Sequence, residues 1–266
     1  MENKEEKLFK MRHSLAHIMA AAIQRIYPDA KFGVGPVIND GFYYDIDLGE
    51  NKISEKNFGK IEKVMRRIVA EKQDFLRSEV LIDEAISWAK ETSQPYKLEL
   101  LNDLKKAGTT NAKILAEGDF ELGNGAETVS FYTNGNYKDL CRGPHLSNTG
   151  EVGAFKLMRV AGAYWRGDEK NPQMQRLYGV AFETQEELDE YLERMEEAKK
   201  RDHRKLGKEL DLYTVSPLVG IGLPLFTPRG TILRDVLANY SNQLRQKYGF
   251  EKVWTPHITK KDLYEK

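Results

Sequence analysis

The stretch GVGPVINDGFYYDID, residues 33–47, indicates the class of fold. Two runs rich in β-branched and aromatic residues flank Asn39-Asp40-Gly41, and an Asp-Gly pair between such runs is typical of a β-hairpin. The hairpin predicts antiparallel strand pairing early in the chain. Further strands are expected at residues 128–132, 153–160 and 175–182.

Apolar residues that recur every three or four positions predict helices between these strands. The first helix is expected to begin near Lys10 and to end at Tyr27, because Pro28 cannot continue it. Strands and helices do not alternate regularly, which predicts an α+β fold with an antiparallel sheet. Other helices are expected at 54–75, 82–92, 98–107 and 232–244, and a short strand at 251–255. Residues 108–126 are expected to form a loop or lid with weak structure, and residues 137–141 to enter a loop that contains Gly143-Pro144.

Residues 184–208 differ in character from the rest of the chain. Thr184-Gln185-Glu186-Glu187 has the pattern of a capping box, which marks the start of a helix. Acidic residues crowd the first half of the segment and basic residues the second half, an order that complements the helix dipole. The segment therefore predicts one long, largely solvated helix that links two domains.

Charge and composition exclude several classes of protein. The 266 residues hold 41 Lys and Arg against 41 Asp and Glu, so a general polyanion-binding protein is not expected. The single cysteine, Cys141, cannot form an intrachain disulfide, which favours a reducing compartment. The sequence contains no apolar run of about 20 residues and no signal-peptide pattern, so we expect a cytoplasmic protein without a membrane partner.

Two short motifs contain residues that are suited to catalysis or metal binding. HSLAH, residues 13–17, presents two histidines one helical turn apart, and DLCRGPH, residues 139–145, holds Cys141 and His145 on a Gly-Pro loop. Together they form a His/His/Cys/His set that suits zinc. A histidine pair alone is more often solvated, and a lone cysteine is usually a small hydrophobic residue. Ser14 stands where a zinc protease carries its glutamate, which argues against a peptidase.

Four motifs in order resemble the editing domain of bacterial threonyl-tRNA synthetases. They are HSLAH, GPVINDGFYYD (35–45), DLCRGPH and AGAYWRGD (161–168), and the related alanyl-tRNA synthetase editing domains share the two histidine motifs. KRDHRK (200–205) resembles the linker helix of the family, and the segment that ends at Pro256 is similar to motif 1 of class II synthetases. The resemblance implies an editing domain at 8–183, a linker helix at 184–208, and the start of a class II catalytic α/β segment at 209–266.

The resemblance implies part of a threonine–tRNA ligase whose complete site hydrolyses mischarged seryl-tRNA(Thr). The class II motifs 2 and 3 and the small amino-terminal domain of the family have no counterpart, so we expect a fragment that does not aminoacylate alone. A free-standing deacylase of the alanyl type and a non-catalytic tRNA-binding or dimerisation fragment are the alternatives. The linker argues against the first, and the intact motifs argue against the second.

The resemblance also implies roles for individual residues. His13 is expected to position or deprotonate water, and Lys97, in Pro95-Tyr96-Lys97-Leu98-Glu99, to stabilise charge or protonate the leaving group. Asp139 is expected to bind the seryl amine, while His17, Cys141 and His145 line the pocket. Substrate contacts are expected from Tyr132, Asp139 and Arg142, and tRNA contacts from Arg166, Lys200, Arg201 and Arg204.

Partners and cofactors follow from the same resemblance. The threonyl branch is expected to edit without a required metal, whereas in the alanyl branch the set matching His13, His17, Cys141 and His145 holds zinc, so zinc stays an open alternative. ATP, Mg2+ and Zn2+ are expected only for the full-length synthetase. The implied partners are tRNA(Thr), serine or threonine, and a second copy of the full-length enzyme.

Overall fold

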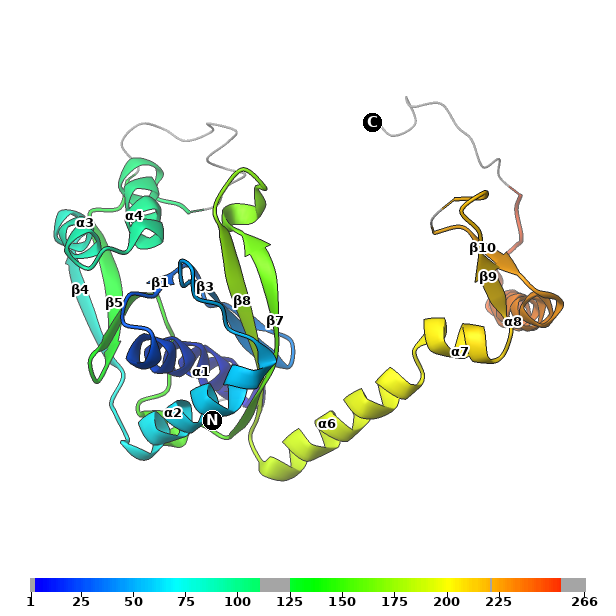
Figure 1. Ribbon diagram of the computed structural model, residues 1–266, viewed down its shortest axis with the longest axis horizontal. Coiled ribbons are helices and arrows are strands. Elements are labelled where there is room, and N and C mark those ends of the chain that lie inside the picture. Colours follow the sequence, from blue (N-terminus) through cyan, green and yellow to red (C-terminus); the bar gives the residue numbers. More distant parts are fainter. Residues whose placement is uncertain (1–2, 111–124, 221, 255–266) are drawn as a thin grey trace. The chain divides into compact units, whose positions relative to one another are not determined.

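The computed structural model describes residues 3–110, 125–220 and 222–254 (Figure 1). The chain divides into two compact units, Met1–Tyr191 and Leu192–Lys266, which are described separately. Within the described ranges, none of the helices combines the length and apolar character that crossing a bilayer requires.

Helix α1 (Lys4–Ile26) runs through the middle of the first unit. It begins at Lys4 rather than near Lys10, because Asn3 caps it by accepting a hydrogen bond from the amide of Glu5. It ends before Tyr27, as the proline at 28 predicts. Nearly every residue from Met11 to Ile23 is buried, so the face that carries the two histidines is covered as well as the apolar stripe.

An antiparallel sheet packs against α1 and confirms the predicted mixed fold. The hairpin at residues 38–41 is confirmed, since Ile38 pairs with Gly41. The strand order is β1-β3-β8-β7, with β2 also paired to β3. The strands are β1 (Lys31–Phe32), β2 (Val37–Ile38), β3 (Gly41–Asp47), β7 (Ala154–Tyr164) and β8 (Gln173–Phe182).

Helix α2 (Phe58–Ala70) lies beside α1 and follows a short 3-10 turn, Glu55–Asn57. Ile61, Met65 and Ile68 are its buried residues, and they belong to the same core as the apolar residues of α1 and β3. The predicted helix over 54–75 is therefore too long at its end. Residues after Ala70 turn and enter a strand instead.

A second, three-stranded sheet has the order β4-β5-β6, with antiparallel pairing throughout. The predicted loop at 137–141 is wrong, because β6 occupies most of it, and β4 was not predicted at all. Strand β4 is an exposed edge strand whose partner lies about 50 residues further along the chain, a non-local pairing that local patterns do not reveal. The strands are β4 (Leu76–Leu81), β5 (Thr128–Asn134) and β6 (Tyr137–Leu140).

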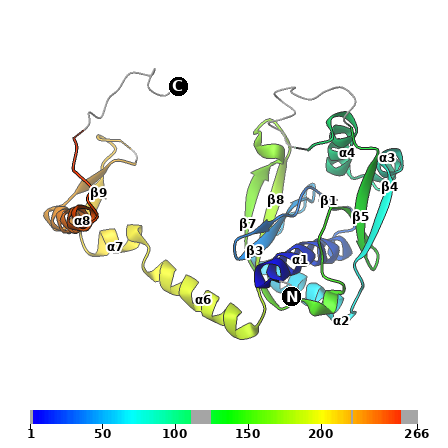
Figure 2. The same ribbon diagram turned by 180° about the vertical axis from the view of Figure 1, so that it is seen from behind.

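Two helices cover one face of this second sheet. Helices α3 (Ile82–Glu91) and α4 (Pro95–Ala107) lie side by side (Figure 2), and Phe131 of β5 packs with them in a separate core. Helix α4 starts with Pro95, a residue whose fixed backbone angle suits the first turn. Lys97 is therefore in the first turn of α4 and not in a loop before it. Only residues 108–110 and 125–126 of the predicted loop at 108–126 are described.

The predicted linker helix over 184–208 is interrupted. Helix α6 (Gln185–Lys200) starts as predicted, because Thr184 Oγ1 accepts a hydrogen bond from the amide of Glu187. The helix stops near Arg201, and Asp202 caps the following helix α7 (His203–Glu209) by accepting from the amide of Arg204. An aspartate that satisfies a free backbone amide begins a new helix, which explains the break.

The second unit continues with a two-stranded hairpin and helix α8 (Pro228–Lys247). Its strands, β9 (Tyr213–Val215) and β10 (Pro224–Phe226), pair antiparallel and were not predicted. The expected strand at 251–255 is wrong for residues 251–254, and the rest of it lies outside the described residues. The apolar stripe of α8 is exposed, with Val236 at 59% and Leu237 at 60%.

We predict that the buried face of α1 governs the stability of the first unit. Leu15 is 0% exposed, so Leu15→Ala should lower the free energy of unfolding by about 2–5 kcal/mol, measured by urea denaturation. Leu76→Ala removes the same atoms from a side chain that is 63% exposed. This variant should change the free energy of unfolding by less than about 1 kcal/mol. Similar losses for both variants would contradict the central position of α1.

Candidate active site

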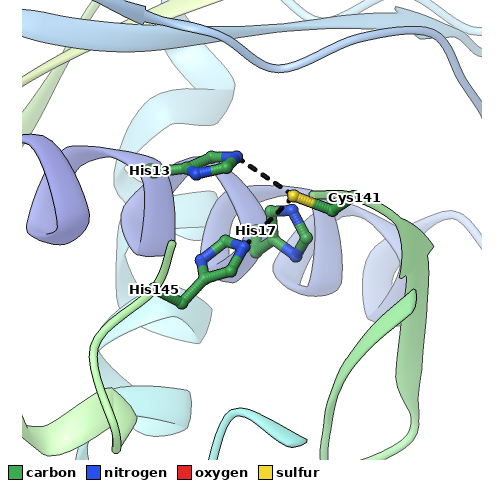
Figure 3. Close-up of side chains that lie close together, drawn as sticks. All are labelled: His13, His17, Cys141 and His145. Carbon is green, nitrogen blue, oxygen red and sulfur yellow. Dashed lines mark hydrogen bonds between the residues drawn. The ribbon is translucent and has the colours of Figure 1, made fainter. Parts of the chain in front are cut away.

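Four side chains from two distant parts of the chain lie close together (Figure 3). Helix α1 provides His13 and His17, and the segment after β6 provides Cys141 and His145. The Cys141 Sγ atom lies 3.3 Å from His13 Nε2 and 3.3 Å from His145 Nε2. The rings of His13 and His145 stack with centroids 4.2 Å apart. The two motifs singled out from the sequence thus form one cluster, which we call the His/Cys cluster.

Backbone groups and a serine fix the orientation of these rings. His13 Nδ1 lies 3.1 Å from the carbonyl oxygen of Pro144, and because a carbonyl only accepts, His13 donates from Nδ1. Its Nε2 therefore faces Cys141 Sγ as an acceptor. Ser14 Oγ lies 3.3 Å from His145 Nδ1 and accepts a hydrogen bond from the amide of Leu146 at 3.0 Å.

A buried ion pair lies beside the cluster. The Lys97 ammonium is 2.5 Å from Asp139 Oδ1, and both side chains are nearly inaccessible to solvent, at 4% and 3%. Tyr44 of β3 completes the group, because its hydroxyl donates to Asp139 Oδ2 and accepts from Lys97 at 3.2 Å. The buried carboxylate of β6 in the second sheet therefore contacts one side chain from α4 and one from β3 in the first sheet.

Burial keeps the four cluster residues neutral. It lowers the pKa of His13, and it lowers the pKa of His17 well below the usual value, with further contributions from His13 and Lys97. The pKa of His145 is lowered by burial and by the two other imidazoles. Burial also raises the pKa of the Cys141 thiol to about 12. His17 Nε2 is 3.7 Å from Asp139 Oδ2, and because His17 is neutral this contact is not an ion pair.

The donor set also fits a metal ion. One ligand atom from each of His13, His17, Cys141 and His145 lies within 4.8 Å of the others, and His17 Nδ1 is buried without a hydrogen-bond partner. Two imidazole nitrogens at 3.3 Å from a sulfur match the ligand spacing of a tetrahedral zinc site, about 3.3–3.8 Å. When bound, zinc would polarise a carbonyl oxygen or a water.

The remaining predicted substrate residues lie around the cluster. The Tyr132 ring is 4.4 Å from the His145 ring, and Gly143, which has a φ of +77°, lies against the Tyr132 hydroxyl. Arg142 is exposed and lines a cavity of about 610 Å3 together with Cys141 and Ser130. Asp139 faces Lys97 and Tyr44 rather than this cavity, and it is 2% exposed.

The four predicted tRNA contacts all lie in ion pairs. Arg166 pairs with Glu99 at 2.9 Å and with Asp103, and it is largely buried. Lys200, Arg201 and Arg204 are exposed and pair with carboxylates close to them in the sequence, Glu197 and Asp202. A phosphate would have to compete with these carboxylates, so tRNA binding by these residues stays a prediction.

Sequence reasoning did not assign a role to Tyr44 or Ser14. Tyr44 alternates with Phe42 and Ile46 along β3, so its pattern is that of a core residue. Ser14 lies inside HSLAH, but no sequence pattern predicts its contacts with His145 and Leu146. A buried tyrosine needs a hydrogen-bond partner for its hydroxyl group. This requirement is the one signal in the sequence that could have indicated a polar partner for Tyr44, such as Asp139.

Comparisons with known proteins give one family. Residues 129–178 match the family described as "Threonyl and Alanyl tRNA synthetase second additional domain". The chain is 45% identical over 252 residues to the threonine--tRNA ligase of Cytophaga hutchinsonii, which is 95% of this chain and 36% of that protein. It is 47% identical to the threonine--tRNA ligase of Bacillus velezensis over 99% of this chain and 38% of the relative. The chain thus spans little more than a third of its relatives.

We predict that Cys141 is an unreactive thiol. With a pKa of about 12, its thiolate fraction at pH 8 is far below that of a free cysteine, whose pKa is about 8.5. Alkylation by iodoacetamide should be about a hundredfold slower or more than for glutathione, and it should rise about tenfold per pH unit from pH 8 to pH 10. The chain unfolded in guanidinium is the control. A folded thiol that reacts as fast as glutathione would contradict the buried cluster.

Proposed function

Because the chain belongs to the family of bacterial threonyl-tRNA synthetases, we propose that its His/Cys cluster hydrolyses the ester of mischarged seryl-tRNA(Thr). The observation that carries the proposal is a cluster of three neutral imidazoles, in which His17 lies 3.7 Å from Asp139, the carboxylate that pairs with the Lys97 ammonium. The group provides a proton acceptor near a fixed positive charge, and both lower the barrier to ester hydrolysis.

A separate hydrolytic site is needed because serine and threonine differ by one methyl group. A binding pocket gains only about 1–3 kcal/mol from a methyl group, or roughly 10–200-fold discrimination. A synthetase that makes threonyl-tRNA therefore needs a second site that removes the smaller amino acid. This double-sieve argument supports serine as the preferred substrate of the pocket.

We assign the base to His13. Its Nε2 is an acceptor that faces the cluster, and its lowered pKa keeps it unprotonated near pH 7. Water attacks the ester carbonyl, and the bond from that carbon to the ribose oxygen breaks. The proton taken from water passes through His13 to the ribose oxygen, so the products are serine and tRNA with a free hydroxyl.

We assign charge stabilisation to Lys97 and the positioning of Lys97 to Asp139 and Tyr44. Both Asp139 oxygens are engaged, one by Lys97 and one by Tyr44, so an additional contact with the seryl amine would compete with them. A fixed ammonium stabilises the oxyanion that develops on the ester carbonyl. Cys141 is not proposed as a nucleophile, because its raised pKa leaves almost no thiolate at pH 7.

The wider assignments are proposals of the same kind. We propose tRNA(Thr) as partner, serine as product, a cytoplasmic location, and ATP, Mg2+, Zn2+ and dimerisation for the full-length ligase. Aminoacylation by this chain alone is not proposed. A free-standing alanyl-type deacylase is disfavoured, since the identity to threonine--tRNA ligases extends over 95–99% of the chain.

We predict that hydrolysis depends on His13 and Lys97. His13→Ala and Lys97→Ala should each reduce single-turnover deacylation of seryl-tRNA(Thr) by about a hundredfold or more, because each removes a group that acts in the transition state. His203→Ala changes an exposed histidine in α7 and should leave the rate unchanged. Release of radiolabelled serine measures each rate.

Threonyl-tRNA(Thr) and alanyl-tRNA serve as the specificity controls. The proposal requires that the chain deacylates seryl-tRNA(Thr) much faster than threonyl-tRNA(Thr). Equal rates on all three substrates, or no hydrolysis by the unsubstituted chain, would refute it. The same samples, assayed with and without added Zn2+ or a chelator, decide whether the cluster uses a metal.

A further inference from the structure

Helix α2 presents a run of cations on its outer surface. Ile61, Met65 and Ile68 form its buried face, and at 100° per residue Lys60, Lys63 and Arg67 lie on the opposite side. All three of these cations are exposed. We call them the α2 basic face. From Lys60 to Arg67 it extends about 10 Å along the helix axis, at 1.5 Å per residue.

No ion pair joins these three cations to a carboxylate in the described part of the chain, unlike the predicted tRNA contacts at Arg166, Lys200 and Arg204. The neighbouring acids are already engaged. Glu62 pairs with Arg66 at 3.1 Å and accepts from the amide of Leu157 at 2.9 Å. Glu71 receives two hydrogen bonds from Arg25, each of 2.8 Å, and Arg67 is only a minor contributor to the lowered pKa of Glu71.

The predicted tRNA contacts, unlike the α2 basic face, are already paired with carboxylates. Lys200 and Arg204 are held by carboxylates at 2.7 Å, as is Arg166 by Glu99 at 2.9 Å. Binding of a phosphate by any of these would break an existing ion pair. The α2 basic face has no such ion pair to break, and the chain as a whole has a net charge of zero. The positive field at this helix is therefore local.

We propose that the α2 basic face binds the phosphate backbone of tRNA. The proposal rests on the proposed function, which supplies an RNA substrate, and it adds a surface outside the catalytic pocket. Charge complementarity favours a polyanion, since each lysine or arginine that contacts a phosphate releases counterions. An anionic membrane is the weaker fit, because the apolar side chains of α2 are buried in the core and cannot enter a bilayer.

The position of α2 suits a substrate-holding role. The helix packs on α1, which carries two residues of the His/Cys cluster, and the apolar residues of both helices share one core. RNA bound to α2 is therefore held by an element fixed to the catalytic helix. Contacts of this kind set affinity and orientation, and they do not take part in the chemical step.

The test is a salt series of tRNA binding by the full chain. A transcript of tRNA(Thr), followed by fluorescence anisotropy, is titrated with the unsubstituted chain and with the triple variant K60Q/K63Q/R67Q. The triple variant should bind about tenfold more weakly or worse at low salt. The slope of log affinity against log salt should fall by about 2, since each lost phosphate contact removes roughly 0.7–0.9.

A matched variant controls for net charge. K52Q/K90Q/K170Q removes three exposed lysines from other surfaces and should retain the affinity and the slope of the unsubstituted chain. Circular dichroism of both variants checks the fold. Equal weakening by the two triple variants, or no weakening by K60Q/K63Q/R67Q, overturns the proposal. So does a result in which that variant loses binding to phosphatidylglycerol vesicles but keeps its affinity for tRNA.

Hydrolysis of a small ester separates this proposal from the proposed function. The seryl ester of adenosine has no duplex to reach α2, so K60Q/K63Q/R67Q should cleave it as fast as the unsubstituted chain. If the unsubstituted chain binds tRNA through α2 and hydrolyses no seryl ester, the proposed function fails and the binding face stands. If it hydrolyses the ester and the triple variant binds tRNA unchanged, only the binding face fails.

Discussion

The buried pair of Lys97 and Asp139 is the interaction on which the site depends. Two opposite charges at 4% and 3% exposure are stable only when each has a close partner and the remaining polar atoms are satisfied. Asp139 reaches this state because α4 brings the lysine and β3 brings the Tyr44 hydroxyl. The carboxylate thereby ties the second sheet to α4 and to the first sheet. Removing either charge would leave the other buried without a counterion.

The chemistry of the His/Cys cluster follows from the same burial. Burial, then the His13 imidazole and the positive charge of Lys97, lower the pKa of His17, and burial together with the other two imidazoles lowers the pKa of His145. The cluster therefore offers neutral nitrogen acceptors near the buried ion pair of Lys97 and Asp139. That combination suits attack by water on an ester, and it also suits a zinc ion, because both uses require imidazoles that are not protonated.

Much of this arrangement could be predicted from the sequence, and the failures have different causes. The hairpin at Asp40-Gly41 and the mixed antiparallel fold rest on local patterns, and the structure confirms them. Strand β4 and the role of Tyr44 depend on partners that lie far away in the chain, which no local window contains. Strand β6 pairs with the adjacent β5 across the turn at residues 135–136, so distance in the chain does not explain why it was missed. The break before Asp202 was missed for another reason, since charge order predicts a helix but does not reveal a competing cap.

The most direct test of the account is a crystal structure of the chain with an adenosine whose 3′ position carries a seryl amide, which the pocket cannot hydrolyse. The account predicts the seryl carbonyl within hydrogen-bond reach of His13, directly or through one water, and on the side of the cluster where Lys97 lies. It also predicts that Asp139 keeps its bonds to Lys97 and Tyr44. A seryl group bound outside the His/Cys cluster, or bound to an Asp139 that has released Lys97, would contradict it.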